Sequence, residues 1–335
     1  MIEDPKRILL IQLRAIGDVI LTTPAVRLVK RRFPTAKIDF VTNAVPAEIL
    51  QGNPHIHRII PKTYAKNDIL GALRFFAGLR CNRYDIVVDF LGTPGTAQMT
   101  FFSGAKTRIG YDLRIRKFAY THIRPTARSD IYNALAKMTL LEPLGIKPED
   151  PYPEIFVTED ARQWAENYFD DNKLDGNRIV AVAPAAKRQA RRWMPEYYAE
   201  VSDWLLEEGY SVVMPWGPGE KEYVEGVAGR MKRKPLLTPP LNLMQLAALL
   251  QRCQLLLCNC GGTKHFAAAV GTSTLSMYGA SDPRAWTPPD DPRHIFLVAD
   301  VDCINCGQKE CEPMDCMKRL TPDRVIEAAQ KMLEG

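Results

Sequence analysis

The stretch CNCGGTKHFAAAVG, residues 258–271, joins an apolar, strand-like run to a helix of alanines through two adjacent glycines. Glycines let a ligand approach the backbone closely, and the free N–H groups and dipole of a helix N-terminus attract phosphate. Gly261, Gly262 and His265 are therefore candidates for binding an anionic group. A tight strand-to-helix turn whose Lys264 and His265 face solvent would give the same pattern, so the rest of the chain must decide.

Two further turns carry charged side chains after strand-like runs. The segment APAAKRQARRWMPEYYAEV places Lys187, Arg188, Arg191 and Arg192 between a predicted strand and a helix that begins near Pro195. These cations could neutralise a diphosphate through charge-assisted hydrogen bonds, or they could form a basic surface loop.

The third charged turn is WGPGEKE, in which Glu220 opens a helix and could accept a hydrogen bond from a ribose hydroxyl. In parallel α/β sheets, ligands bind at the carboxyl ends of the strands. Each of the three turns follows a strand-like run, so together they offer the parts of a nucleotide diphosphate site.

The first turn of the chain, RAIGDVILTTPAV, has one glycine, Gly17, where the dinucleotide fingerprint needs three. This disfavours a nicotinamide or flavin enzyme. Asp18 stands at the start of a helix, where a carboxylate is often only a helix cap. In a cleft between two domains it could instead act as a general base that accepts a hydroxyl proton.

The segment from Lys106 to Arg128 is strongly basic, with one acid, Asp112. It could bind phosphates of a lipid or a nucleic acid, or form a solvated face. No aromatic and basic strand platform is present in the sequence, so we expect no nucleic acid partner.

Four cysteines near the C-terminus have the spacing C-x2-C-x4-C-x4-C. They are Cys303, Cys306, Cys311 and Cys316. This spacing is compact enough to enclose a structural zinc ion or an iron–sulfur cluster. Reduced thiols are the alternative in a cytosolic chain, and a redox or metal-sensing function stays open.

The elements that must position these residues alternate between strand-like and helical patterns. The strand-like runs are RILLIQL, KIDFVTN, RYDIVVDFLG, RIVAVAPAA, YSVVMPWG, CQLLLCN and STLSMYGAS. Nearly continuous apolar runs that alternate with helices indicate buried parallel strands and doubly wound α/β domains. A chain of 335 residues is also longer than one hydrophobic core usually supports.

We therefore expect two Rossmann-like domains, residues 1–160 and 161–320, and a C-terminal helix, residues 321–335, that could pack back on the N-terminal domain. The charged, proline-rich stretch EDPYPEIF and the helix after it mark the hinge region. No apolar run approaches the length of a membrane span, and the N-terminus lacks a secretory signal, so we expect a cytoplasmic protein.

In combination, these segments resemble the ADP-heptose:lipopolysaccharide heptosyltransferases, glycosyltransferase family 9, over essentially the whole chain. The resemblance lies in RAIGDVILTTPAV, RRWMPEYYAEV, WGPGEKE, NCGGTKHFAAAVGTSTLSMYGASDP and CINCGQKECEPMDCMKRLTPDRVIEAA. It implies a GT-B fold whose N-terminal domain binds the acceptor and whose C-terminal domain binds an ADP-sugar donor. It also implies inverting transfer that requires no catalytic metal or other cofactor.

The resemblance also assigns roles by position. Asp18 would be the general base, and Arg191, with Lys187 and Arg192 near it, would contact the diphosphate. Glu220 would approach the nucleoside. The glycine and histidine motif would surround the diphosphate, through Gly261, Gly262 and His265.

One position departs from the family pattern. Cys260 stands where the family commonly has an Asp, five residues before the His, and a thiol cannot offer the two acceptor oxygens of a carboxylate. Asn259 could take over part of that role. The donor sugar, heptose or another, therefore stays open.

The implied acceptor is a lipid A/Kdo-type lipopolysaccharide, presented at the cytoplasmic face of the inner membrane. Five basic residues are expected to bind its phosphates and acidic sugars. They are Arg14, Arg108, Arg114, Arg116 and Lys117. The apolar helix ILGALRFFAGLR, with Phe75 and Phe76, is expected to pack as a crossover helix, and contact with the bilayer is the alternative. A noncatalytic protein of the same fold that binds a sugar nucleotide or lipopolysaccharide is the rival interpretation.

Overall fold

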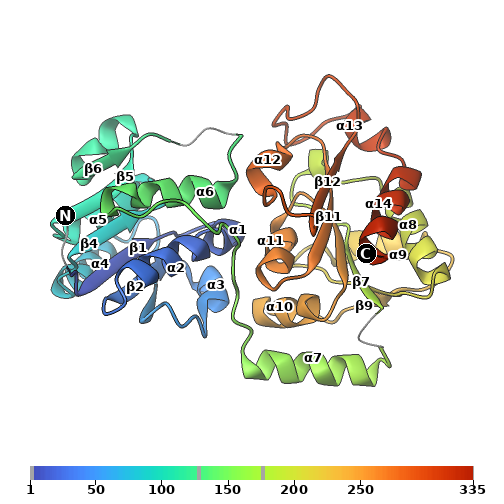
Figure 1. Cartoon of the computed structure of the whole chain (residues 1–335), viewed down its shortest axis with the longest axis horizontal. Helices are drawn as coiled ribbons and strands as arrows, with labels where there is room; N and C mark the ends of the chain where they lie inside the picture. Colours follow the sequence, from blue (N-terminus) through green and yellow to red (C-terminus); the bar gives the residue numbers. More distant parts are fainter. Residues whose placement is uncertain (1–3, 127–129, 175–177, 335) are drawn as a thin grey trace. The chain divides into compact units, whose positions relative to one another are not determined.

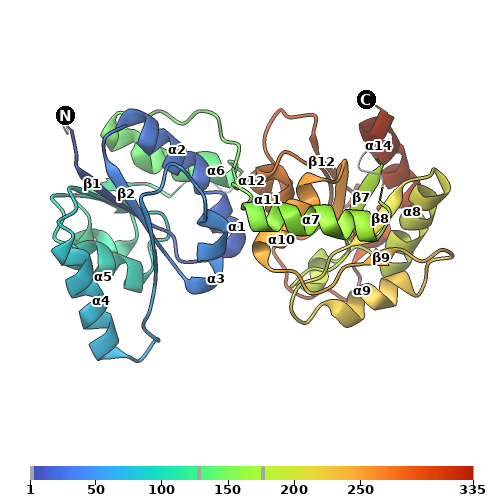
Figure 2. The same cartoon turned by 90° about the horizontal axis from the view of Figure 1, so that it is seen from below.

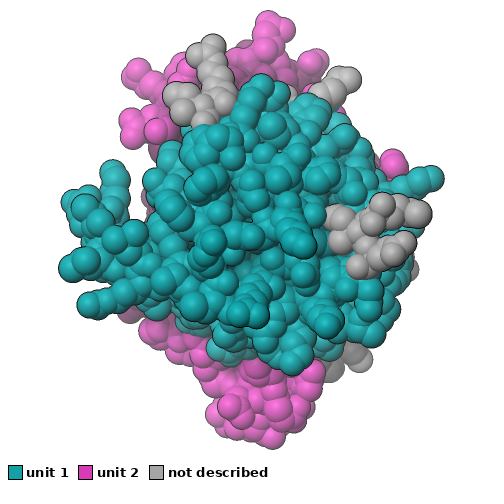
Figure 3. All heavy atoms as spheres, turned by 90° about the vertical axis from the view of Figure 1, so that its left-hand side faces the viewer, with its two compact units in different colours: residues 1–156 teal, residues 157–335 magenta. Residues whose placement is uncertain are grey.

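The structure is a computed structural model that describes residues 4–126, 130–174 and 178–334, with the side chains of Arg114 and Ile115 also left out. The chain forms two compact units, residues 1–156 and 157–335 (Figures 1 and 3). The boundary lies four residues before the expected one. Among the described residues, no helix has the length and apolar character to cross a bilayer.

Unit 1 is built on a sheet of six strands in the order β3-β2-β1-β4-β5-β6, and every neighbouring pair is parallel. Its strands are β1 (Arg7–Ile11), β2 (Lys37–Thr42), β3 (Arg58–Pro61), β4 (Ile86–Asp89), β5 (Thr107–Tyr111) and β6 (His122–Arg124). Its helices are α1 (Ile16–Ile20), α2 (Thr23–Arg32), α3 (Ala44–Ala47), α4 (Ile69–Cys81), α5 (Pro94–Phe102) and α6 (Asn133–Met138). Short 3-10 helices are η1 (Glu48–Leu50), η2 (Arg114–Ala119) and η3 (Thr139–Leu144).

The helices of unit 1 cover both faces of its sheet. Figure 2 shows α4 and α5 on one side of the strands and α2 and α6 on the other. Phe76 and Leu79 of α4 and Met99 of α5 pack with Leu9 and Val87 of the strands in one core. These strands are buried on both faces, which explains their nearly continuous apolar sequences.

Unit 2 repeats this architecture, with strands in the order β12-β11-β10-β7-β8-β9 and parallel pairing throughout. Its strands are β7 (Ile179–Ala183), β8 (Ser211–Met214), β9 (Leu236–Leu237), β10 (Leu255–Asn259), β11 (Ser273–Tyr278) and β12 (His294–Val298). Its helices are α7 (Glu159–Asp171), η4 (Gln189–Arg191), α8 (Pro195–Glu207), α9 (Lys221–Ala228), α10 (Leu243–Gln251), α11 (Gly262–Ala269), α12 (Pro283–Trp286), α13 (Asp315–Lys318) and α14 (Pro322–Glu334).

Both sheets have the strand order of dinucleotide-binding domains. When β7 is counted as the first strand of unit 2, its order becomes 3-2-1-4-5-6, the same as in unit 1. In each sheet the strands are added to one side up to the third strand and to the other side from the fourth strand on, so the order reverses between the first and fourth strands. Ligands of such sheets bind at this switch point, outside the carboxyl ends of the strands. The turns after β1 and β4, and those after β7 and β10, are therefore where binding residues belong.

The last helix, α14, packs against α8 and β11 (Figure 1). Its buried residues Val325, Ala329 and Leu333 repeat every four positions and belong to the same core as Trp193. The sequence suggested that this helix could pack back on the N-terminal domain; its apolar stripe is instead part of the core of unit 2.

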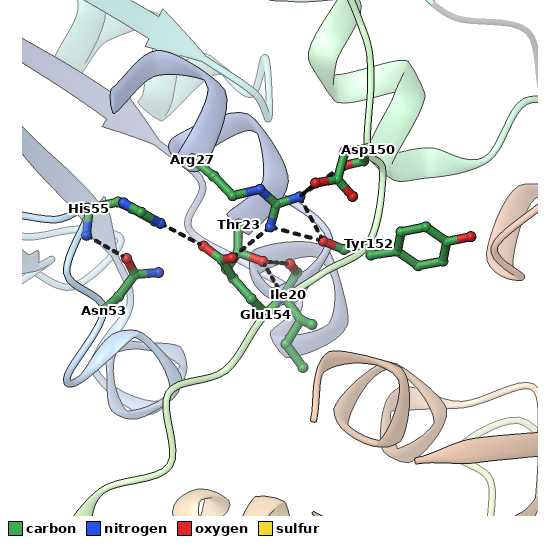
Figure 4. A network of polar contacts seen from close by, with 8 residues as sticks. All are labelled: Ile20, Thr23, Arg27, Asn53, His55, Asp150, Tyr152 and Glu154. Carbon is green, nitrogen blue, oxygen red and sulfur yellow. Dashed lines mark hydrogen bonds and ion pairs between the residues drawn. The ribbon is translucent and has the colours of Figure 1, made fainter. Parts of the chain in front are cut away.

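The end of unit 1 is tied to the helices that follow β1. Arg27 of α2 donates to the carboxylate of Glu154 at 2.6 Å and to the carbonyl oxygen of Asp150 at 2.8 Å (Figure 4). The hydroxyl of Thr23 accepts from the backbone N–H of Glu154 and donates to the carbonyl oxygen of Ile20. These bonds fix the short α1–α2 segment, which contains Asp18.

Candidate active site

Asp18 lies in the first turn of α1, directly after β1. Its Oδ2 accepts a hydrogen bond from the N–H of Ala15 at 3.2 Å, and its Oδ1 lies 3.6 Å from the Nζ of Lys137. The side chain is 31% exposed. Asp18 therefore caps its helix, as the simpler interpretation proposed, and still presents its carboxylate to solvent, where a hydroxyl could reach it.

Lys137 is a buried cation beside Asp18 that sequence reasoning missed. It lies on α6 and donates a 2.9 Å hydrogen bond to the Oε1 of Gln12 on the segment after β1. Burial lowers the pKa of Lys137, while the charges of Asp18 and Asp89 raise it. In the sequence, Lys137 stands out only as a charge inside the apolar run NALAKMTLL. Its contacts with Asp18 and Gln12 are seen only in the folded structure.

Asp89 ends β4 on the other side of the switch point and is fully buried. Its carboxylate accepts hydrogen bonds from the N–H groups of Leu91 and Gly92, at 3.0 and 2.9 Å, and from the hydroxyl of Tyr120 at 2.7 Å. Burial raises its pKa although these bonds oppose the shift. Asp89 therefore shapes the turn after β4, a role that sequence reasoning missed.

Two of the predicted acceptor-binding arginines are engaged by backbone carbonyl groups. Arg108 donates from Nε to Ala119 at 2.7 Å and from Nη1 to Ala105 at 2.6 Å. Arg116 donates to the carbonyl oxygen of Gly92. Arg108 therefore holds the β5–β6 connection together, because its Nε and Nη1 bind carbonyl groups on either side of β5.

The other predicted acceptor residues are more accessible. Arg14 is exposed, and Lys117 forms an exposed ion pair with Asp112 at 2.7 Å. The side chain of Arg114 lies outside the described residues, as does the whole of Arg128.

A pocket of about 560 Å³ lies between α5 and the segment after β5. It is lined by Pro94, Ala97, Gln98, Asp112, Leu113, Arg116 and Phe118. The pocket lies next to the turns after β4 and β5, at the carboxyl edge of the sheet, and Arg116 brings one predicted acceptor residue to it.

In unit 2, the glycine turn follows β10 as predicted. Gly261 is the N-cap of α11, which begins at Gly262. Lys264 and His265 are buried and do not face solvent, so the simple solvated turn is the wrong interpretation. Lys264 donates to the hydroxyl groups of Tyr278 at 2.5 Å and Thr287 at 2.9 Å.

Burial lowers the pKa of both buried side chains in this turn. It lowers the pKa of Lys264 to about 8, and burial together with the charge of Lys264 lowers the pKa of His265 to about 3. His265 is therefore neutral at physiological pH and can donate only one ring N–H. Cys260 is buried close to Lys264, whose pKa its thiolate form would raise.

Asn259 links the two turns at the switch point of unit 2. Its side-chain oxygen accepts from the N–H of Trp193 at 2.8 Å, and its Nδ2 donates to the carbonyl oxygen of Pro184 at 2.6 Å. The residue is 1% exposed. Its amide oxygen and its amide nitrogen each bind a backbone group, so Asn259 positions the loop after β7.

The loop after β7 carries four cations, of which Arg192 is anchored and Arg188 is partly exposed. Arg192 donates to the carbonyl oxygen of Ala186 at 2.7 Å and its guanidinium group stacks 4.7 Å from the ring centre of Tyr223. Lys187 is exposed. Arg191 is half-buried, and within the described part of the chain its buried Nε has no hydrogen-bond partner. Lys187 and Arg191 are thus the cations that an anionic ligand could contact.

Glu220 lies in a small pocket at the carboxyl ends of β7 and β8. Its Oε2 accepts from the N–H of Gly217 at 2.9 Å. The pocket has a volume of about 100 Å³. It is lined by Ala183, Ala185, Pro215, Trp216, Gly217, Pro218, Glu220, Leu241, Asn242, Leu243, Leu246 and Thr263. A flat apolar ring could enter between these residues, with Glu220 at its edge.

The four cysteines do not form the predicted metal centre. In the part of the chain that the structure describes, no three His, Cys, Asp or Glu side chains gather as metal ligands. Cys303 and Cys306 are exposed, whereas Cys316 is buried and its thiol packs against Gly279. Cys316 is part of the core of unit 2, and Cys311 packs against this core. Burial raises the pKa of the Cys316 thiol, and the neighbouring thiols Cys303, Cys311 and Cys306 raise it further, so the four cysteines lie in one region of unit 2.

Comparison with known proteins agrees with this architecture. The family described as glycosyltransferase family 9 (heptosyltransferase) matches residues 72–317. The chain belongs to this family. It is therefore a glycosyltransferase, and its two Rossmann-like units form a GT-B fold.

Relatives in family 9 match the chain over nearly its full length. It is 29% identical over 338 residues to lipopolysaccharide heptosyltransferase 3 of Escherichia coli K12, covering 95% of each chain. The crystal structure of a family 9 glycosyl transferase from Veillonella parvula superimposes with a TM-score of 0.89 at 26% identity, covering 100% of this chain and 99% of the other. E. coli heptosyltransferase WaaC with ADP-2-deoxy-2-fluoro heptose has the same fold, with a TM-score of 0.74 at 19% identity and coverage of 97% and 99%.

Proposed function

We propose that this protein transfers heptose from ADP-heptose to the inner core of lipopolysaccharide, with inversion of configuration and without a catalytic metal. The observation that carries the proposal is Asp18, a carboxylate held in the turn after β1 and still 31% exposed. Heptosyltransferase relatives and the family match support the class of reaction.

In the proposed reaction, Asp18 accepts the proton of an acceptor sugar hydroxyl. The hydroxyl oxygen forms a bond to the anomeric carbon of the donor while the bond from that carbon to the diphosphate oxygen breaks. Attack opposite the leaving group inverts the configuration, and ADP leaves with the bonding electrons. General base catalysis of this kind contributes about 10²–10⁴-fold to the rate.

The residues around the turns after β7 and β10 would bind the donor. Lys187 and Arg191 supply positive charge for the diphosphate, and the N-terminus of α11 at Gly261 and Gly262 supplies backbone donors. These groups would stabilise the negative charge that grows on the leaving diphosphate. The small pocket beside Glu220 would hold the nucleoside.

A second candidate donor follows from Cys260. The turn has a thiol at this position and a buried lysine, Lys264, where the chain turns into α11. Without a carboxylate here, the contacts to the donor sugar change, and a different nucleotide sugar could be the substrate. The increase in melting temperature with ADP, UDP or GDP shows which nucleotide the protein binds. Competition between different ADP-sugars for the protein then shows which sugar it prefers.

We also propose that the α4–α5 face of unit 1 contacts the inner membrane. Apolar side chains are exposed on α4, α5 and η2, namely Ile69, Leu70, Leu73, Phe101, Phe102 and Phe118. The phenylalanine rings of α5 and η2 contact one another, and Arg74, Arg80 and Lys106 are exposed nearby in the sequence. Apolar side chains accompanied by cations are typical of surfaces that bind anionic lipids.

Cosedimentation with anionic vesicles tests this surface. Wild-type protein should pellet with the vesicles and the double variant Phe101→Ser/Phe118→Ser should stay in the supernatant, with Trp164→Ser on α7 as a control for the loss of an aromatic ring. Equal pelleting of all three proteins would show that the α4–α5 face does not bind the membrane.

The transfer reaction is tested by incubating the protein with ADP-heptose and Kdo-containing lipid A in EDTA, with acceptors that lack or carry the first heptose. Transfer to either acceptor supports the proposed function, and the preferred acceptor identifies the step. If ADP binds but no heptose moves, the proposal for heptose fails and the alternative donor is favoured.

A further inference from the structure

We propose that Lys137 is a positioning residue that holds the carboxylate of Asp18 in one orientation for proton abstraction. This inference rests on the proposed function, in which Asp18 is the general base. Lys137 lies on α6, far in sequence from the turn after β1, and its Nζ is 3.6 Å from Asp18 Oδ1.

The lysine is attached to this turn at two points. Besides its ion pair with Asp18, its Nζ donates to Gln12 Oε1 at 2.9 Å, and Gln12 Nε2 donates in turn to the carbonyl oxygen of Arg14 at 2.5 Å. Gln12 is fully buried and Lys137 is 6% exposed. The amide of Gln12 thus links the ammonium group to the backbone two residues before Ile16–Ile20, the helix that holds Asp18.

Burial of a lysine without a carboxylate partner is costly, so this pairing carries chemical meaning. The ionisable groups that act on Lys137 are Asp18 from α1 and Asp89 from β4. Asp89 is buried and its oxygens accept three hydrogen bonds, from Leu91, Gly92 and Tyr120, whereas Asp18 is partly exposed. Asp18 is therefore the partner that an acceptor hydroxyl could reach.

The ion pair holds one oxygen of Asp18 on the α6 side, while the N–H of Ala15 holds the other from the backbone. Lys137 thus restricts the carboxylate to one orientation. A general base must lie within hydrogen-bond reach of the proton that it accepts, so its orientation matters for the rate. Removing the ammonium group should leave Asp18 present but free to rotate.

The test compares kcat and KM for heptose transfer by wild type, Lys137→Met and Lys137→Arg, together with ADP affinity. Lys137→Met should lower kcat by roughly tenfold with little change in KM, because the carboxylate of Asp18 loses its fixed orientation. Lys137→Arg keeps the positive charge and should recover most of the wild-type kcat. ADP affinity should be unchanged in both.

An unchanged kcat in Lys137→Met, or an equal loss of kcat in Lys137→Met and Lys137→Arg, would overturn the inference, because the positive charge at this position would then not orient Asp18. Circular dichroism and thermal unfolding confirm that each variant is folded, and if Lys137→Met is unfolded, Lys137→Gln takes its place. Wild-type protein that transfers no heptose would refute the proposed function instead. Transfer that is lost in Asp18→Asn but normal in Lys137→Met would refute this inference alone.

Discussion

Replacing Asn259 by alanine should lower the free energy of unfolding of unit 2 without removing a contact to the donor. The amide joins the N–H of Trp193 to the carbonyl oxygen of Pro184. All three groups are buried. The variant leaves one backbone donor and one backbone acceptor unpaired, and each such group costs about 1–3 kcal/mol, so we expect a loss of roughly 2–6 kcal/mol.

Urea unfolding of wild type and Asn259→Ala measures this loss, with Asn172→Ala as the matched control. Asn172 ends α7 and donates one exposed hydrogen bond to Tyr168, so its replacement should change stability by about 0.5 kcal/mol or less. ADP affinity is measured on the folded proteins. A variant Asn259→Ala that is as stable as wild type but no longer binds ADP would refute the reasoning and return Asn259 to the donor site.

Two further predictions concern stability. Burial lowers the pKa of His265 to about 3 and that of His294 to about 4, whereas histidine in an unfolded chain titrates near 6.5. The unfolded state therefore takes up protons first as the pH falls, and unfolding free energy should drop by about 2 kcal/mol for each histidine between pH 7.5 and pH 5; urea unfolding that is independent of pH in this range would contradict both burial assignments. Val325→Ala in α14 should lower stability by about 2 kcal/mol because it leaves a cavity in the core of unit 2. The exposed control Glu327→Ala should change it little, and equal effects would show that α14 is not packed in that core.

The fold could be predicted from sequence where strands are central. All seven strand-like runs form strands, because central strands of a parallel sheet are buried on both faces and read as continuous apolar segments. The strands that were missed are short or lie towards the sheet edges, and they are β3, β5, β6, β9 and β12. Both β5 and β6 lie inside the basic segment, which we interpreted only as a binding surface; their polar residues concealed the strand pattern.

The candidate site could be predicted where a turn carries its own signal. The turns with Asp18, Glu220 and Gly261 follow strands as expected. Lys137 and Asp89 escaped notice because their importance comes from partners distant in sequence or from burial.

Residue type was misleading where the backbone already uses the side chain. Asn259 and Arg108 have the chemistry of ligand contacts, but their polar atoms bind main-chain groups. The cysteine spacing suggested a metal, whereas one thiol packs in the core and two others are exposed. Such outcomes depend on long-range packing, which spacing along the chain does not encode.

The central claim is that Asp18 is the base of an inverting, metal-independent heptosyl transfer. Its most direct test is the turnover of ADP-heptose on Kdo-containing lipid A in EDTA by wild type and by Asp18→Asn, with ADP affinity measured alongside. We predict transfer by wild type and a kcat at least about 10²-fold lower in the variant, with ADP affinity unchanged. Near-normal turnover by Asp18→Asn, or wild-type turnover that EDTA abolishes, would contradict the account.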